Sequence, residues 1–296
     1  MTDQTPRSYP QGVPSWIEAR QPDPEAARAF YGGMFGWDLE ERVPPGAPGS
    51  YSIASIGGLD VGAIASSDDP ATWTTYIAVD DADAVAARVV ELGGTAAAPQ
   101  DAGPGGSAGR GVDCVDPRGA AFGLWQARDR PGAQHINSPG GWVFSDLRSP
   151  EPERAIAFYE RLFGWQVSDV HEGPSAMIRL PGYGDHLART SDPDIRTRQV
   201  GAPEGFADVI GALARTGDGD DGVSGTVAGS GTAADALHDD WHVSFSVADR
   251  DEAAARAERL GGRLLGTWEG FWTRAAELQD PQGATFRVTQ FAPSAG

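Results

Sequence analysis

The stretch that decides the fold is Pro22-Asp23-Pro24-Glu25-Ala26-Ala27-Arg28-Ala29-Phe30-Tyr31, followed by Phe35-Gly36-Trp37. It returns as Pro150-Glu151-Pro152-Glu153-Arg154-Ala155-Ile156-Ala157-Phe158-Tyr159, followed by Phe163-Gly164-Trp165, at a constant offset of 128 residues. Two further blocks also return, Trp73–Val79 as Trp241–Val247 and Asp116-Pro117-Arg118-Gly119 as Asp280-Pro281-Gln282-Gly283. Three blocks in the same order, twice, indicate two homologous modules.

Each repeated stretch predicts a helix. Pro24 and Pro152 suit the first helical position, where the missing N–H is not needed, and Gly36 and Gly164 suit the end of the helix. The blocks at Trp73 and Trp241 alternate as half-buried strands and lead into Ala-rich second helices. Two closing strands meet at the Asp-Pro-x-Gly turn. The expected order in each module is β-α-β-β-α-β-β, an α+β fold.

These motifs resemble the glyoxalase/bleomycin-resistance/extradiol-dioxygenase family, the vicinal oxygen chelate (VOC) superfamily, over residues 13 to about 291. The resemblance implies tandem paired βαβββ modules, each of which forms a cup-shaped sheet open to a small molecule. Within this family, the sequence is similar to two-module actinobacterial proteins labelled hydroxylase. Some of those proteins accompany aromatic polyketide antibiotic pathways of the daunorubicin and doxorubicin type.

The expected organisation has four parts. They are an N-terminal tail (1–12), VOC module 1 (13–128), a Pro- and Gly-rich linker (129–140) and VOC module 2 (141–292), with an insertion over about 183–240. The insertion explains why the second offset, 168 residues between Trp73 and Trp241, exceeds the first.

The net charge limits the classes of binding partner that we expect. Of 296 residues, 42 are acidic and 23 basic, so the net charge is −19, and every basic residue is Arg. A nucleic-acid or anionic-membrane partner is therefore not expected, and Lys chemistry is excluded. No apolar run is long enough to span a membrane, and the first ten residues do not look like a signal peptide, so we expect a cytoplasmic protein.

The resemblance also implies where a metal would bind. The family's ligand positions fall on Trp16, Thr74 and Gly123 in module 1 and on Phe144, His242 and Arg287 in module 2. Of these six, His242 alone suits a metal, with Glu18 and Asp146 nearby as the remaining donors. We therefore expect no metal site and no cofactor.

Strand alternation predicts what lines each cup instead. The first cup should receive Trp16, Glu18, Thr74, Tyr76 and Trp125. The second should receive Trp142, Phe144, Asp146, His242, Ser244, Ser246, Thr285, Arg287 and Thr289, with Trp272 of the cluster before the closing strands as a pocket wall. Aromatic walls with a few polar anchors suit a flat organic ligand.

Three functions remain open. The leading one is a metal-free protein that binds a polycyclic aromatic natural product, for sequestration or to assist a partner oxygenase. The second is a cofactor-independent hydroxylase, cyclase or isomerase in which His242 is the base, with Arg287 and Asp146 beside it. The third is a metal-dependent glyoxalase or dioxygenase. Because two modules can pair within one chain, we expect a monomer or loose dimer, with the ligand in the second cup.

Overall fold

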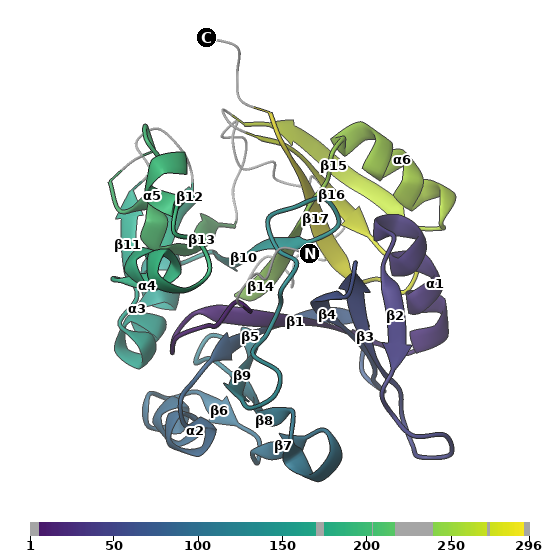
Figure 1. The fold of residues 1–296 in the computed structure, drawn as a ribbon, viewed down its shortest axis with the longest axis horizontal. Coiled ribbons are helices and arrows are strands. Elements are labelled where there is room, and N and C mark those ends of the chain that lie inside the picture. The colour runs from purple at the N-terminus through teal and green to yellow at the C-terminus, as the bar shows by residue number, and fades with distance from the viewer. Residues whose placement is uncertain (1–5, 170–174, 203, 217–238, 271–272, 293–296) are drawn as a thin grey trace.

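The computed structural model describes residues 6–169, 175–202, 204–216, 239–270 and 273–292. Its strands form two curled sheets, one from each half of the chain (Figure 1). The first half contains β1 (Pro14–Gln21), α1 (Pro24–Phe35), β2 (Asp38–Glu41), β3 (Tyr51–Ile56), β4 (Leu59–Ser66), β5 (Thr72–Ala78), α2 (Ala82–Glu91), β6 (Thr95–Ala96), β7 (Gln100–Ala102), η1 (Pro104–Gly106), β8 (Gly109–Val115) and β9 (Ala121–Ala127). The second half contains β10 (Trp142–Ser149), α3 (Pro152–Phe163), β11 (Gln166–Asp169), β12 (Ser175–Arg179), α4 (Tyr183–Thr190), α5 (Ile195–Arg198), η2 (Phe206–Asp208), β13 (Val209–Arg215), β14 (Asp240–Ser246), α6 (Arg250–Arg259), β15 (Arg263–Glu269), β16 (Thr273–Gln279) and β17 (Thr285–Phe291).

The two sheets share one topology. The first runs β2-β3-β4-β1-β5-β9-β8-β6, with β7 also paired to β8, and the second runs β11-β12-β13-β10-β14-β17-β16-β15. In each, two βαβββ units meet where their first strands pair antiparallel, β1 with β5 and β10 with β14. The predicted α+β fold of tandem paired βαβββ modules is confirmed.

The predicted strand order within a module is wrong in two respects. Four strands, not two, lie between α1 and α2 and between α3 and α6, and β6–β9 or β15–β17 follow the second of these helices where two strands were expected. The sequence signal is weak because β2 is a short edge strand, Asp38–Glu41, in which Leu39 is the one apolar residue. In β4, Gly62 interrupts the apolar pattern because a Cβ there would lie 2.8 Å from the carbonyl oxygen of Ile17 on β1.

The repeated helices begin and end as predicted. The Asp23 carboxylate accepts hydrogen bonds from the backbone N–H groups of Glu25 and Ala26 at the start of α1. Gly36 ends α1 and Gly164 ends α3, with φ of 73° and 75°, a conformation that favours glycine.

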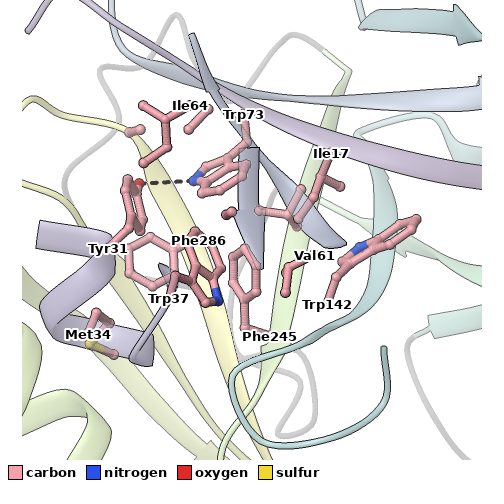
Figure 2. Packing of buried hydrophobic residues seen from close by; sticks show 14 of the residues in the cluster. Ile17, Tyr31, Met34, Trp37, Val61, Ile64, Trp73, Trp142, Phe245 and Phe286 are labelled. Atoms are coloured by element: carbon pink, nitrogen blue, oxygen red, sulfur yellow. Dashed lines mark hydrogen bonds between the residues drawn. The ribbon is translucent and has the colours of Figure 1, made fainter. Parts of the chain in front are cut away.

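The repeated residues join the modules to each other. Helix α1 packs against α6 of the other module, and α2 packs against α3. Figure 2 shows Tyr31 and Trp37 from the first module in one buried cluster with Phe245 and Phe286 from the second. The ring centroids of Phe35 and Phe245 are 4.7 Å apart. The two halves therefore share their cores.

Hydrogen bonds across this interface come in matched pairs. Trp37 Nε1 donates to the carbonyl of Gly140 at 2.8 Å, and Trp165 Nε1 donates to that of Gly12 at 2.8 Å. The hydroxyl of Tyr31 donates to Asp280 Oδ2 at 2.8 Å, and the hydroxyl of Tyr159 donates to Asp116 Oδ2 at 3.0 Å. Each Asp-Pro-x-Gly turn is thus bound to the first helix of the other module.

The expected insertion is not one segment. Strand β13 lies inside residues 183–240 but belongs to the sheet, where Asp146 on β10 pairs with Ala212, as Glu18 on β1 pairs with Ala63 on β4. The extra chain is added on both sides of β13. One part carries α4, α5 and η2 between β12 and β13, where the first module has only the turn Gly57-Gly58. The other part, residues 217–238, lies outside the described residues.

Among the helices in the described ranges, none is long and apolar enough to cross a membrane.

Candidate functional site

Four neighbouring strands bring a charged cluster onto one face of the second sheet, which we call the second cup. Asp146 on β10 lies opposite His242 on β14, and Ser244 on β14 lies beside Arg287 on β17. The β16–β17 hairpin places Glu277 opposite Arg287. The sequence therefore assembles Asp146, His242 and Arg287 as predicted, and it adds Glu277.

Ion pairs connect the cluster. Arg287 Nη1 donates to Asp146 Oδ2 at 2.5 Å. Arg148 Nη2 donates to both carboxylate oxygens of Glu277, at 3.0 and 3.1 Å, and His242 Nε2 lies 2.9 Å from Glu277 Oε1. Asp146, His242 and Glu277 are all at most 5% exposed. Each buried carboxylate therefore has its own guanidinium.

The charges fix the protonation states. Burial opposes ionisation of Glu277, but the neighbouring Arg148 guanidinium holds its pKa well below its usual 4.5. Burial lowers the pKa of His242 from 6.5, and the Arg148 guanidinium lowers it further. At neutral pH the pair is a carboxylate beside a neutral imidazole. In the tautomer with the proton on Nε2, the atom 2.9 Å from Glu277 Oε1, Nδ1 would be the acceptor nitrogen.

This donor set does not fit a divalent metal. Asp146, His242 and Glu277 could supply oxygen and nitrogen ligands, but a cation there would be repelled by Arg148 and Arg287. Both carboxylates would also have to leave their arginine partners. Within the described ranges, no group of three or more His, Cys, Asp or Glu residues is arranged to hold a metal ion.

Arg287 also forms a flat platform. Its guanidinium carbon lies 4.8 Å from the centroid of the Trp268 ring on β15, a cation–π contact. Close to Arg287, the Ser244 and Thr289 hydroxyls are 2.9 Å apart, and Phe144, which pairs with Ser244 on the neighbouring strand β10, is half-buried. Trp272, predicted as a pocket wall, lies outside the described residues.

The equivalent face of the first sheet, the first cup, has a similar charged cluster. Glu18, Arg20 and Asp113 occupy the places of Asp146, Arg148 and Glu277 in the repeat. Arg20 donates to Glu18 Oε1 at 3.0 Å, to the Tyr76 hydroxyl at 2.7 Å and to Asp113 Oδ1 at 2.6 Å.

The ring of Tyr76 occupies the centre of the first cup. It lies over Gly123, where even a Cβ atom would overlap it. In the second cup the corresponding residues are Ser244 and Arg287. The serine is smaller than the tyrosine, whereas the arginine is larger than the glycine, so a cation replaces the ring in the second cup.

Two other predicted residues of the first cup, Trp16 and Trp125, are hydrogen-bonded to neighbouring residues. The indole N–H of Trp16 donates to the Tyr51 hydroxyl at 3.3 Å, and that of Trp125 donates to the carbonyl of Arg130 at 2.9 Å. Trp16 and Tyr76 are each 8% exposed, and Thr74 is 5% exposed. These aromatic side chains pack the first cup rather than leave it open.

Trp142 does not point into the second cup as strict alternation predicted. A β-bulge between Trp142 and Phe144 shifts the register, so Trp142 pairs with Phe245, which packs against α1 on the opposite face. Figure 2 shows Trp142 in the buried cluster with Ile17 and Val61. Ser246, at the end of β14, is half-buried and hydrogen-bonds through its backbone to Gly141.

Sequence reasoning missed Glu277 and Arg148. A signal for Glu277 exists, since counting back from the Asp280–Gly283 turn pairs Gln279 with Thr285 and hence Glu277 with Arg287. Arg148 follows Asp146 by two residues on the same face of β10.

Comparison with known proteins identifies relatives across nearly the whole chain. The model of the glyoxalase-like domain matches residues 16–125 and again 142–289. CFP32 of Mycobacterium tuberculosis, a candidate glyoxylase by name, is 34% identical over 293 residues, which are 96% of this chain and 97% of that protein. The anthracycline biosynthesis protein DnrV of Streptomyces peucetius is 31% identical over 307 residues, covering 95% of this chain and 94% of that protein.

Solved structures share the fold at much lower identity. The Mn(II)-bound glyoxalase of Novosphingobium aromaticivorans has a TM-score of 0.58 at 15% identity, over 95% of this chain and 82% of that one. The 2,3-dioxygenase LapB of Pseudomonas sp. KL28 has a TM-score of 0.57 at 13% identity, over 96% and 97% of the two chains. At this identity the likeness concerns the fold alone.

Proposed function

The chain belongs to the glyoxalase-like domain family, and from that premise we propose that it binds a polycyclic aromatic natural product in its second cup without a metal ion. The ligand class follows the anthracycline biosynthesis proteins that it resembles at 31% identity. Binding would serve to sequester the compound or to present it to a partner oxygenase. The two modules complete both cups within one chain, so the proposal requires no second copy.

The difference between the two cups carries this proposal. The repeat keeps an acid, an arginine and a second acid in both cups, yet the first is filled by Tyr76 lying on Gly123. The second has Ser244 in place of the ring and Arg287 in place of the glycine. The second cup thus has a small hydroxyl side chain and a cation at the two positions where the first cup has a tyrosine ring and a glycine.

The chemistry of the second cup suits a flat molecule with oxygen substituents. Arg287, held by Asp146 and stacked on Trp268, presents a fixed planar donor to phenol or quinone oxygens. Phe144 offers an aromatic wall, and stacked rings contribute about 0.5–1.5 kcal/mol beyond the area they bury. The Ser244 and Thr289 hydroxyls supply further hydrogen bonds.

A second candidate function is metal-free catalysis with His242 as the base. The lowered pKa of His242 keeps the imidazole neutral near pH 7, the state a base requires. Nδ1 would take a proton from carbon next to a ligand carbonyl, and the electron pair would move onto the carbonyl oxygen, stabilised by Arg287. Return of the proton at another carbon gives an isomerase, while attack of the carbanion on a second carbonyl carbon of the same ligand, whose oxygen then takes up the proton, gives a cyclase. In an oxygenation the carbanion would add to O2 as co-substrate, and the resulting hydroperoxide would lose water to leave a new carbonyl group.

Replacing Phe144 by Ala should weaken binding of an anthracycline aglycone by about 1–3 kcal/mol, the cost of removing a buried aromatic contact. Quenching of tryptophan fluorescence and calorimetry on chelator-treated protein measure the dissociation constant. Trp16→Ala, checked for folding by circular dichroism, should change it little.

The reverse order of the two variants would place the ligand in the first cup and overturn the proposal. Mass spectrometry of the recovered aglycone separates the two functions. An unchanged compound supports binding, whereas conversion without added enzymes or metal, lost in His242→Gln, supports catalysis.

A further inference from the structure

Around Arg287, the second cup exposes arginine rather than carboxylate. The side chain of Arg287 is 22% exposed, whereas that of its partner Asp146 is 8% exposed. Likewise, Arg148 is 19% exposed and its partner Glu277 3% exposed. The two acids balance the two arginines in number, but they are more deeply buried. A ligand that enters the cup therefore meets arginine before it meets a carboxylate.

The first cup exposes the opposite charge. Its arginine, Arg20, binds both Glu18 and Asp113, and the side chain of Asp113 is 53% exposed. Position 123, which corresponds to Arg287 in the repeat, is glycine. The most exposed charge in that cluster is thus a carboxylate. Of the two cups, the second is the one whose exposed charge attracts an anion.

Arg287 keeps part of its hydrogen-bonding capacity. Its Nη1 donates to Asp146 Oδ2, and its Nε is buried, 3.9 Å from Glu277 Oε2. A guanidinium carries five N–H donors, and among the described residues no acceptor contacts Nη2. The ring of Trp268 lies over the face of the group, so it does not compete for these in-plane N–H groups.

The other charged groups of β10 and β14 do not cancel the charge of Arg287. His242 is neutral near pH 7 because burial lowers its pKa. Asp240 is exposed, but it lies opposite Arg148 and four residues from Ser244, the neighbour of Arg287. At about 3.3 Å per residue, that separation is about 13 Å along the strand. In physiological salt, exposed charges are largely screened beyond about 8 Å.

The strands on the other side of Arg287 add no free acid. Glu269 on β15 is bound by Arg250 and Arg274. On β17 itself, the residues two before and two after Arg287 are threonines, Thr285 and Thr289. The field next to Arg287 is therefore positive.

A hydroxyl group next to such a cation loses its proton more easily, because a cation within about 4–6 Å lowers the pKa of an acid by about 1–3. Simple phenols ionise near pH 10, and a phenol conjugated to a quinone carbonyl ionises lower because the carbonyl spreads the charge. We therefore propose that the second cup binds a hydroxylated aromatic ligand as its phenolate, with the phenolate oxygen on Nη2 of Arg287 and the proton released to solvent. This inference rests on the function proposed above and adds the ionisation state and the anchoring group of the ligand.

Alizarin, 1,2-dihydroxyanthraquinone, tests the proposal because its visible absorbance changes when a hydroxyl ionises. Chelator-treated protein is titrated with alizarin over a range of pH, and separately with 1,2-dimethoxyanthraquinone, which cannot ionise. We expect the apparent pKa of bound alizarin to lie about 1–3 below that of free alizarin. Its dissociation constant should thus fall at least about tenfold as the pH rises to the free pKa, and then level off. That of the dimethoxy compound, measured by tryptophan fluorescence, should not change.

Variants test the role of Arg287. Arg287→Gln should remove the change in the pKa of alizarin, whereas Arg287→Lys, which keeps the charge, should retain most of it. Asp146→Asn removes the carboxylate beside Arg287 and should enlarge the change. Arg274→Gln is the matched control, since Arg274 lies on the neighbouring strand β16 but binds Asp251 of α6 on the other face of the sheet. Circular dichroism shows that each variant is folded, and the dimethoxy compound shows that its cup still binds.

The outcomes separate this inference from the function on which it rests. Bound alizarin with an unchanged or raised pKa would overturn the inference and leave the proposed function standing. A lowered pKa that persists in folded Arg287→Gln would assign the anion to another cation and overturn the inference as well. If neither compound binds, the proposed function fails, and this inference fails with it.

Discussion

Replacing Glu277 by Gln should reduce the free energy of unfolding by about 3–5 kcal/mol at pH 7, the cost of leaving a buried charge without its partner. Glu277 is 2% exposed and binds Arg148 through both carboxylate oxygens. The amide retains the shape of the side chain but leaves Arg148 without an anion. Urea unfolding, followed by circular dichroism, measures the difference.

The pH dependence of this difference in unfolding free energy tests whether the charge of Glu277 causes it. The pKa of Glu277 is lowered in the folded state, so its contribution is present above the unfolded value near 4.5 and is lost as the pH falls towards the folded value. The gap between wild type and Glu277→Gln should therefore narrow below about pH 4.5. Glu91→Gln, which removes an exposed partner of Arg88, should cost less than about 0.5 kcal/mol. A gap that does not change between pH 7 and pH 3 would contradict this account.

Replacing Asp280 by Ala should cost about 2–6 kcal/mol, because each buried donor left without an acceptor costs about 1–3 kcal/mol. Asp280 Oδ2 accepts from the Tyr31 hydroxyl and from Gln21 Nε2, both at 2.8 Å and both from the other module. Its Oδ1 accepts two backbone N–H groups that close the turn. The variant therefore weakens the turn and the interface together, and its effect is measured as a shift in the urea midpoint.

The repeat supplies a matched comparison. Asp116 accepts hydrogen bonds from the Tyr159 hydroxyl and two backbone N–H groups, and from no second side chain among the residues that the structure describes. Asp116→Ala should thus be less destabilising than Asp280→Ala by about one buried hydrogen bond, roughly 1–3 kcal/mol. Asp81→Ala, which removes a helix cap on the surface, should cost about 1 kcal/mol. If Asp280→Ala costs no more than the cap, the contact with Tyr31 does not hold the modules together.

The sequence predicts local structure well where only neighbouring residues determine it. Pro24, Gly36 and Gly164 indicate helix boundaries, because their backbone preferences do not depend on distant residues. The sequence predicts less well where a contact with a distant segment determines the conformation. The bulge that turns Trp142 to the other face leaves no mark in the composition of β10, and β4 contains a glycine because β1 approaches it.

The charged cluster shows the same limit. Asp146, His242 and Arg287 follow from the repeat and strand alternation, since each lies on a strand recognisable from its motif. Glu277 requires the register of a hairpin, and only the folded chain shows that it binds Arg148 and not Arg287 most closely.

The overlap between Tyr76 and position 123 imposes an order on the mutational history of the repeat. Any side chain at position 123 would collide with the Tyr76 ring, so a filled first cup cannot acquire an arginine there in one step. A smaller residue would have to replace Tyr76 first, so the residues at positions 76 and 123 constrain each other.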